Sequence, residues 1–136
     1  MKDSQFNFIL NISAILQRFG FLSPVADWIG CQFALESSFG NSRIAKVKNN
    51  YCGMKVPHLR PSLNQNLGSG FATYDSLEDC CTDYVLLLSY NHFTYTQLSN
   101  LDCFLARFKT IHYCDEESYL DAINNIYKIF NSKKNE

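Results

Sequence analysis

Apolar residues recur at helical spacing along most of this chain, and one central segment lacks that pattern. Residues 49–74 instead hold Pro57, Pro61, Gly68 and Gly70, which favour loops and leave room for a short, irregular β-hairpin at most. The chain therefore predicts a mainly helical α+β domain, interrupted by a hairpin or loop insertion over residues 51–74. In the first predicted helix the apolar positions lie mostly three or four residues apart, at Phe6, Ile9, Leu10, Ile12, Leu16 and Phe19.

Residues suited to helix caps mark several helix ends. Gly20 suits the end of the first helix, and Ser23–Pro24 suits the start of the second, which continues to about Glu36. Ser76 is predicted to cap a helix that continues to about Tyr90, with acidic residues in its first turn. Further helices are predicted over 43–47, 100–108 and 116–130, followed by a frayed tail that contains Lys133, Lys134 and Glu136.

Length and charge narrow the class of protein. The 136 residues suit one domain, so we expect a single unit over 1–136. Twelve basic and thirteen acidic residues give a net charge of -1, which offers no electrostatic case for nucleic-acid or anionic-lipid partners. No apolar stretch approaches the ~20 residues of a membrane span, and no secretory signal is recognisable. We expect a monomer.

The six cysteines do not form a metal-binding pattern. They contain no C-x-x-C pair, and their number in a chain of this length is weak evidence for disulfides. We interpret most of them as reduced, buried, small apolar residues, and we predict no metal site. A Cys–His nucleophile or metal site built from His112 and Cys114 is a minor alternative.

Glu36 is the candidate general acid. It follows Ile29 and Phe33 on one helix face, so a carboxylate stands at the end of an apolar stripe. Desolvation and the partial negative charge of a helix C-terminus both disfavour the charged form there. A carboxylic acid that keeps its proton suits glycosidic-bond cleavage, a logic that follows the well-known lysozyme example. The alternative is a glutamate that simply turns to solvent.

Three sequence blocks resemble one enzyme family. Residues 34–46 read ALESSFGNSRIAK, residues 49–55 read NNYCGMK, and residues 71–76 read FATYDS. Together with Asp83-Tyr84 and a later Tyr113, with Tyr119 and Ile123 in the final helix, they resemble the glucosaminidase domain of glycoside hydrolase family 73. The resemblance extends over about residues 4–130, and the first two blocks at their spacing are its most specific part.

The resemblance implies a lysozyme-like fold and hydrolysis of the β-1,4 bond after N-acetylglucosamine in peptidoglycan, without metal or cofactor. Glu36 matches the catalytic acid, and Tyr74 is the second candidate catalytic residue. Peptidoglycan glycan strands are the expected partner. The candidate substrate-binding residues are Asn49, Asn50, Tyr51, Gly53, Ser76 and Tyr113.

The chain departs from the family in one respect. Many members carry a second acidic residue in the hairpin, whereas residues 51–74 contain no Asp or Glu. A mechanism with two carboxylates therefore lacks its expected partner for Glu36. We expect instead that the N-acetyl group of the substrate assists, with Tyr74 supporting it.

Several readings of the function stay open from sequence alone. A bare catalytic domain suits a phage endolysin, and a delivered antibacterial effector has the same sequence features. Either would be made in the cytoplasm and reach the bacterial cell wall by another route. A lytic transglycosylase or muramidase of the same fold is the nearest enzymatic alternative. A wall-binding module that has lost turnover is the non-enzymatic one.

Overall fold

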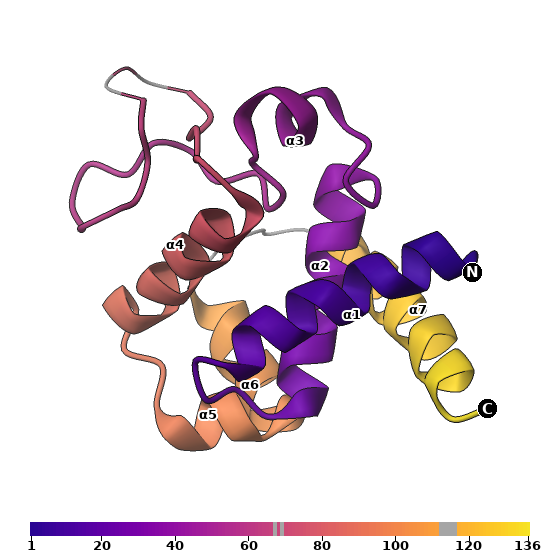
Figure 1. The fold of residues 1–136 in the computed structure, drawn as a ribbon. Coiled ribbons are helices and arrows are strands. Elements are labelled where there is room, and N and C mark those ends of the chain that lie inside the picture. Colours follow the sequence, from indigo (N-terminus) through magenta and orange to yellow (C-terminus); the bar gives the residue numbers. More distant parts are fainter. Residues whose placement is uncertain (67, 69, 112–116) are drawn as a thin grey trace.

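The computed structural model describes residues 1–66, 68, 70–111 and 117–136, which form seven helices (Figure 1). The mainly helical, lysozyme-like fold class predicted from the sequence is confirmed. Four helices agree closely with the predicted ranges, and the short α5 was not predicted. The helices are α1 (Asp3–Gln17), α2 (Ser23–Ser37), α3 (Arg43–Lys48), α4 (Leu77–Tyr90), α5 (Tyr95–Ser99), α6 (Leu101–Thr110) and α7 (Glu117–Lys134).

Helix α2 is the centre of the fold. Eleven of its fifteen residues are buried, and it contacts α1, α5, α6 and α7. A helix that is apolar on nearly all sides belongs inside a helical body. At Gly30 an added Cβ would lie 2.9 Å from the carbonyl oxygen of Ile9 in α1. Glycine therefore lets the backbones of α1 and α2 approach each other closely.

Aromatic side chains fasten α6 and α7 to this central helix. The ring of Trp28 lies 5.7 Å from that of Phe104 and 5.4 Å from that of Phe108, both in edge-to-face contacts. The indole nitrogen of Trp28 donates a 2.8 Å hydrogen bond to Asn124 Oδ1 in α7. One side chain of α2 therefore contacts two other helices.

Two predictions about helix ends were wrong. The C-terminal residues Lys133 and Lys134 belong to α7, because Lys134 Nζ lies 2.7 Å from the buried Asp27 and Lys133 Nζ lies 2.9 Å from Asp3. Ser23 lies inside α2 rather than at its cap, and its hydroxyl donates to Asp27 Oδ2 at 3.2 Å. Tertiary ion pairing thus lengthens α7 beyond the point where its apolar pattern ends.

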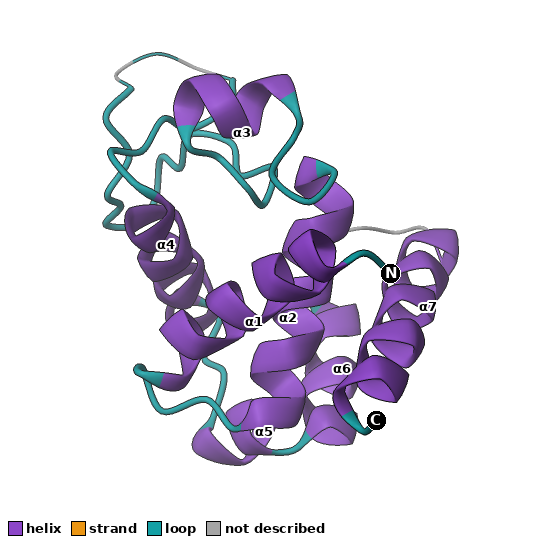
Figure 2. Cartoon of the chain, turned by 45° about the vertical axis from the view of Figure 1, so that its right-hand side comes forward, coloured by secondary structure: helices purple, strands orange, loops and turns teal. Residues whose placement is uncertain are grey.

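Residues 49–76 form an irregular segment that we call the loop lobe. Its predicted hairpin is reduced, within the described residues, to one isolated bridge between Lys55 and Phe71. Ser76 closes the lobe as the predicted cap of α4, because its hydroxyl accepts from the backbone N–H of Asp79 at 3.1 Å. Figures 1 and 2 place the lobe and α3 at one end of the molecule and α5 and α6 at the other.

None of the helices in the described part of the chain is long and apolar enough to cross a bilayer.

Candidate active site

Glu36 lies in the last turn of α2, half-buried, where the helix meets the loop lobe. The helix ends at Ser38, which has left-handed backbone angles. The hydroxyl of Ser37 donates to the carbonyl of Phe33 at 2.7 Å and accepts from the N–H of Gly40 at 2.9 Å. These bonds fix the backbone on both sides of the helix end, so Glu36 projects from a rigid support.

A pocket of about 380 Å³ opens beside this carboxylate. Gly53 contributes its backbone to the wall with a φ of +71°, and an added Cβ would lie 2.9 Å from Glu36 Oε2. Only glycine can both adopt this conformation without strain and leave space for the carboxylate. The pocket is lined by Glu36, Cys52, Gly53, Met54 and Lys55.

Polar side chains from three helices meet on the other side of Glu36. Gln32, one turn earlier in α2, is fully buried and accepts a 2.6 Å hydrogen bond from the hydroxyl of Tyr84 in α4. Its amide donates to the hydroxyl oxygen of Tyr119 in α7 at 3.0 Å. Desolvation, together with the charge of and a hydrogen bond to Glu36, raises the pKa of Tyr119.

The sequence analysis did not single out Gln32. The sequence feature that could have identified it is its position four residues before Glu36, which puts both side chains on one helix face. Tyr84 and Tyr119 were noted only as residues within motif blocks, and their meeting near Glu36 depends on how α4 and α7 pack against α2.

Tyr74, the second predicted catalytic residue, is buried within the loop lobe. Its hydroxyl donates to the carboxylate of Asp83, which also forms a two-pronged ion pair with Arg60 at 2.9 and 3.1 Å. Burial alone would raise the pKa of Asp83, but hydrogen bonds from Arg60 and Tyr74 outweigh it and the pKa is lowered. A catalytic role of Tyr74 stays a prediction, and this geometry favours a role in supporting the lobe.

Asn49 and Asn50 hold the lobe backbone. Asn49, at the C-terminal cap of α3, donates its side-chain amide to the carbonyl of Tyr74 at 3.1 Å. Asn50 is fully buried and donates to the carbonyls of Met54 and Ala72 at 2.8 and 2.9 Å. Its own oxygen accepts from the N–H of Met54 at 3.2 Å. The structure therefore shows a structural use for both amides.

The other predicted substrate-binding residues are dispersed. Tyr51 is half-buried, with its ring 6.1 Å from that of Phe8 in α1. Ser76 uses its hydroxyl to cap α4. Tyr113 lies outside the described residues, as do His112 and Cys114. Of the predicted set, the structure brings Gly53 into close approach to Glu36.

Among the described residues, Cys31, Cys52, Cys80 and Cys81 are buried, Cys103 is exposed, and none of the five forms a disulfide with another. The sulfur atoms of Cys52 and Cys80 lie 3.6 Å apart. Burial raises the pKa of the Cys31 and Cys81 thiols, which disfavours a thiolate nucleophile there. No group of three metal-ligating side chains occurs within the ranges that the structure describes.

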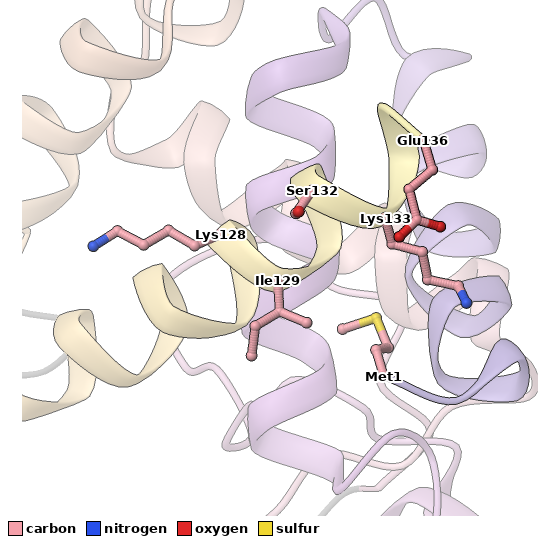
Figure 3. Close-up of a pocket in the computed structure, with 6 residues that line it drawn as sticks. All are labelled: Met1, Lys128, Ile129, Ser132, Lys133 and Glu136. Atoms are coloured by element: carbon pink, nitrogen blue, oxygen red, sulfur yellow. The ribbon is translucent and has the colours of Figure 1, made fainter.

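A second pocket, of about 410 Å³, lies where the N-terminus meets the end of α7 (Figure 3). It is lined by Met1, by residues from the last turns of α7 such as Lys133, and by Glu136, which follows the helix. Tyr119, the α7 residue that faces Glu36, lies near the opposite end of that helix. This pocket is therefore separate from the candidate active site.

Comparisons with known proteins agree with this geometry. A chain from the structure of a type VI secretion system effector-immunity complex from Pseudomonas protegens shares the fold, with a TM-score of 0.68 and 19% identity. The similarity covers 96% of this chain and 94% of that one. No match was found among curated proteins.

The family model for glucosaminidases, described as mannosyl-glycoprotein endo-β-N-acetylglucosaminidase, matches residues 22–132. This range contains Glu36, Gly53, all of α2 and α4, and most of α7. It extends over most of the chain, and the chain belongs to the glucosaminidase family.

Proposed function

We propose that this glycoside hydrolase cleaves the β-1,4 bond after N-acetylglucosamine in peptidoglycan, with Glu36 as the general acid. The observation that carries the proposal is the half-buried Glu36 carboxylate, whose Oε2 faces Gly53 and the pocket. A carboxyl group on a rigid helix end, partly shielded from water, is what protonation of a leaving glycosidic oxygen needs.

The proposed mechanism uses the N-acetyl group of the substrate. Residues 51–74 contain no carboxylate, and Asp83 is committed to Arg60 and Tyr74. The acetamido oxygen attacks the anomeric carbon while the bond to the leaving oxygen breaks and Glu36 gives that oxygen its proton. Water then opens the cyclic intermediate and returns a proton to Glu36, so the products retain their anomeric configuration.

The decisive experiment is Glu36→Gln, assayed by release of soluble fragments from purified sacculi. The amide keeps the shape and removes the proton, so we expect activity to fall by ~10²–10⁴-fold or more. The thermal midpoint should be unchanged. Glu78→Gln, at an exposed position in the first turn of α4, is the matched control and should keep wild-type activity. Full activity in Glu36→Gln would remove this residue from the mechanism.

Mass spectrometry of the fragments separates the enzymatic alternatives. A glucosaminidase leaves N-acetylglucosamine at the reducing end, a muramidase leaves N-acetylmuramic acid, and a lytic transglycosylase leaves an anhydro ring. Binding to sacculi without any fragment release would favour the wall-binding module instead.

We further propose that the chain acts as a monomer on the bacterial cell wall after release or delivery. The similar Pseudomonas protegens chain comes from an effector–immunity complex, which makes a delivered effector with an immunity partner the alternative to an endolysin. Expression of the chain with an added export signal should lyse a Gram-negative host, while cytoplasmic expression should not. The Glu36→Gln variant should be harmless in both compartments.

A further inference from the structure

Three side chains outside the pocket form a directional chain of hydrogen bonds that ends near Glu36. Tyr84 in α4 donates to Gln32 Oε1 at 2.6 Å, and Gln32 Nε2 donates to the hydroxyl oxygen of Tyr119 at 3.0 Å. Gln32 is fully buried and Tyr84 is fully buried. Such buried polar chains persist when every member has a partner, and they fix the orientation of each group.

The direction of these bonds determines where the Tyr119 proton goes. A phenol has one hydrogen to donate, and the oxygen of Tyr119 already accepts from Gln32. Gln32 cannot reverse its amide, because its carbonyl oxygen accepts from Tyr84. The Tyr119 hydrogen therefore points away from Gln32. Burial raises the pKa of Tyr119, and so do the charge of Glu36 and a hydrogen bond with it, which indicates that the phenol and this carboxyl group interact.

We infer that Tyr119 is a positioning residue, which holds the Glu36 carboxyl group in place through a relay that begins at Tyr84 and passes through Gln32. The inference rests on the proposed function for its kinetic consequences. On the lobe side, the backbone of Gly53 lies so close to Glu36 Oε2 that there is no space for a Cβ on this residue. The backbone therefore restricts the movement of the carboxyl group. Tyr119 restrains it from the α7 side. The carboxyl group of Glu36 is thus held between the backbone of Gly53 and the phenol of Tyr119.

Rotational freedom of the acid is costly for catalysis, because misplacement by about 1 Å can lower the rate by ~10²-fold. The titratable groups around Glu36 are Tyr84 from α4, Tyr119 from α7, and Cys52 and Lys55 from the lobe. Both tyrosine pKa values are raised, so these phenols stay protonated donors in the range where a glycosidase works.

The first test is independent of activity. The hydroxyl proton of Tyr119, assigned in the proton NMR spectrum by its disappearance in Tyr119→Phe, should shift upfield in Glu36→Gln. An amide accepts a weaker hydrogen bond than a carboxylate does. The resonance should not move in Tyr127→Phe, which removes a phenol of the same helix that faces Asp27 and Cys31 instead. An unchanged resonance in Glu36→Gln would overturn the inference.

The second test is kinetic. We expect Tyr119→Phe to lower kcat by about 10–100-fold with KM nearly unchanged. The loss should fall on kcat rather than KM, because the acid is held less well while the pocket that binds substrate is unchanged. Tyr84→Phe should show the same pattern in weaker form, because it acts two bonds away. Tyr127→Phe should match the wild type in kcat and KM.

Together, the two tests distinguish failure of the relay from failure of the proposed function. If the hydroxyl resonance responds to Glu36→Gln but wild-type protein releases no fragments, the relay stands and the proposed function fails. If the wild type is active and Tyr119→Phe keeps its kcat, the relay is wrong. An equal loss in Tyr119→Phe and Tyr127→Phe also contradicts it, because that would indicate a general structural effect of α7.

Discussion

The helical body and the loop lobe are held together by different forces. In the body, aliphatic and aromatic side chains such as Trp28, Phe33 and Phe104 are fully buried around α2. In the lobe, amide side chains such as Asn50 bond directly to the backbone, and a buried ion pair joins Arg60 to Asp83. Apolar packing tolerates approximate geometry, whereas each hydrogen bond from a side-chain amide specifies one backbone position.

The candidate active site lies where these two kinds of structure meet. Glu36 comes from the body, on the end of its central helix, and Gly53 comes from the lobe. The body thus supplies the proposed acid, and the lobe supplies one wall of the pocket. The comparison indicates that changes in the body should act mainly on stability, while changes in the lobe should act on the site.

Charge is also distributed unevenly along the chain, with a basic stretch over the end of α2, α3 and most of the lobe. Residues 37–74 contain five Lys and Arg and no Asp or Glu, although the whole chain has a net charge of -1. The remaining residues therefore carry the excess of acid. Although the net charge of the whole chain is close to zero, a basic region therefore lies next to the pocket. Lys55 is one of the residues that line this pocket.

The largest expected effect is on the body. Trp28→Ala should lower the free energy of unfolding by about 3–5 kcal/mol, because it removes a fully buried ring that packs on Phe104 and Phe108. Urea denaturation followed by circular dichroism measures the loss. A cost below about 1 kcal/mol would mean that the core around α2 is not the main source of stability.

A lobe substitution should separate activity from stability. Gly53→Ala places a Cβ 2.9 Å from Glu36 Oε2, so we expect a loss of activity on the order of 10²-fold. Gly70→Ala is the matched control, because Gly70 has a φ of +91° and no atom within 4 Å of an added Cβ. Both variants pay a backbone cost of about 1–2 kcal/mol. Equal activity in the two variants would show that Gly53 is needed only for its positive φ and not for the space that it leaves beside Glu36.

Removal of one amide should test how the lobe is held. Asn50→Ala leaves the carbonyls of Met54 and Ala72 without this donor, at a cost of about 1–3 kcal/mol. Hydrogen exchange should increase in the lobe and stay unchanged in α1 and α2. Asn41→Ala, which removes an exposed bond to Ser38, is the control and should cost much less. Uniformly faster exchange would contradict the division into two regions.

The smallest expected effect is a pH dependence at the ion pair that joins Arg60 of the lobe to Asp83 of α4. The folded-state pKa of Asp83 is lowered below its ordinary value of 3.8, so its ionised form adds stability at neutral pH. That contribution is lost as pH falls below about 4, through the lowered pKa. Comparison of wild type with Asp83→Asn by thermal unfolding should show a gap that narrows on acidification. A gap of constant size would mean that the Asp83 charge does not matter.

Several elements were predictable because their signals are local. Ser76 caps α4 as its sequence position indicates, since a cap needs only the next turn of backbone. The C-terminal end of α7 was not predictable, because Lys134 is held in the helix by Asp27, which is distant in sequence. The α5 helix was missed because its five residues carry no buried apolar stripe.

For the candidate site, the sequence by itself was enough to single out the proposed acid and its neighbours in the chain. Glu36 stands out from the periodicity of its helix and its surrounding motif, and Gly53 from the second block. Only the tertiary structure decided that Gly53 approaches Oε2 and that Asn50 and Tyr74 serve the lobe. It also brought Tyr84 and Tyr119 together through Gln32. Spacing along one helix is set by local backbone geometry, whereas contacts between helices depend on how their buried faces pack.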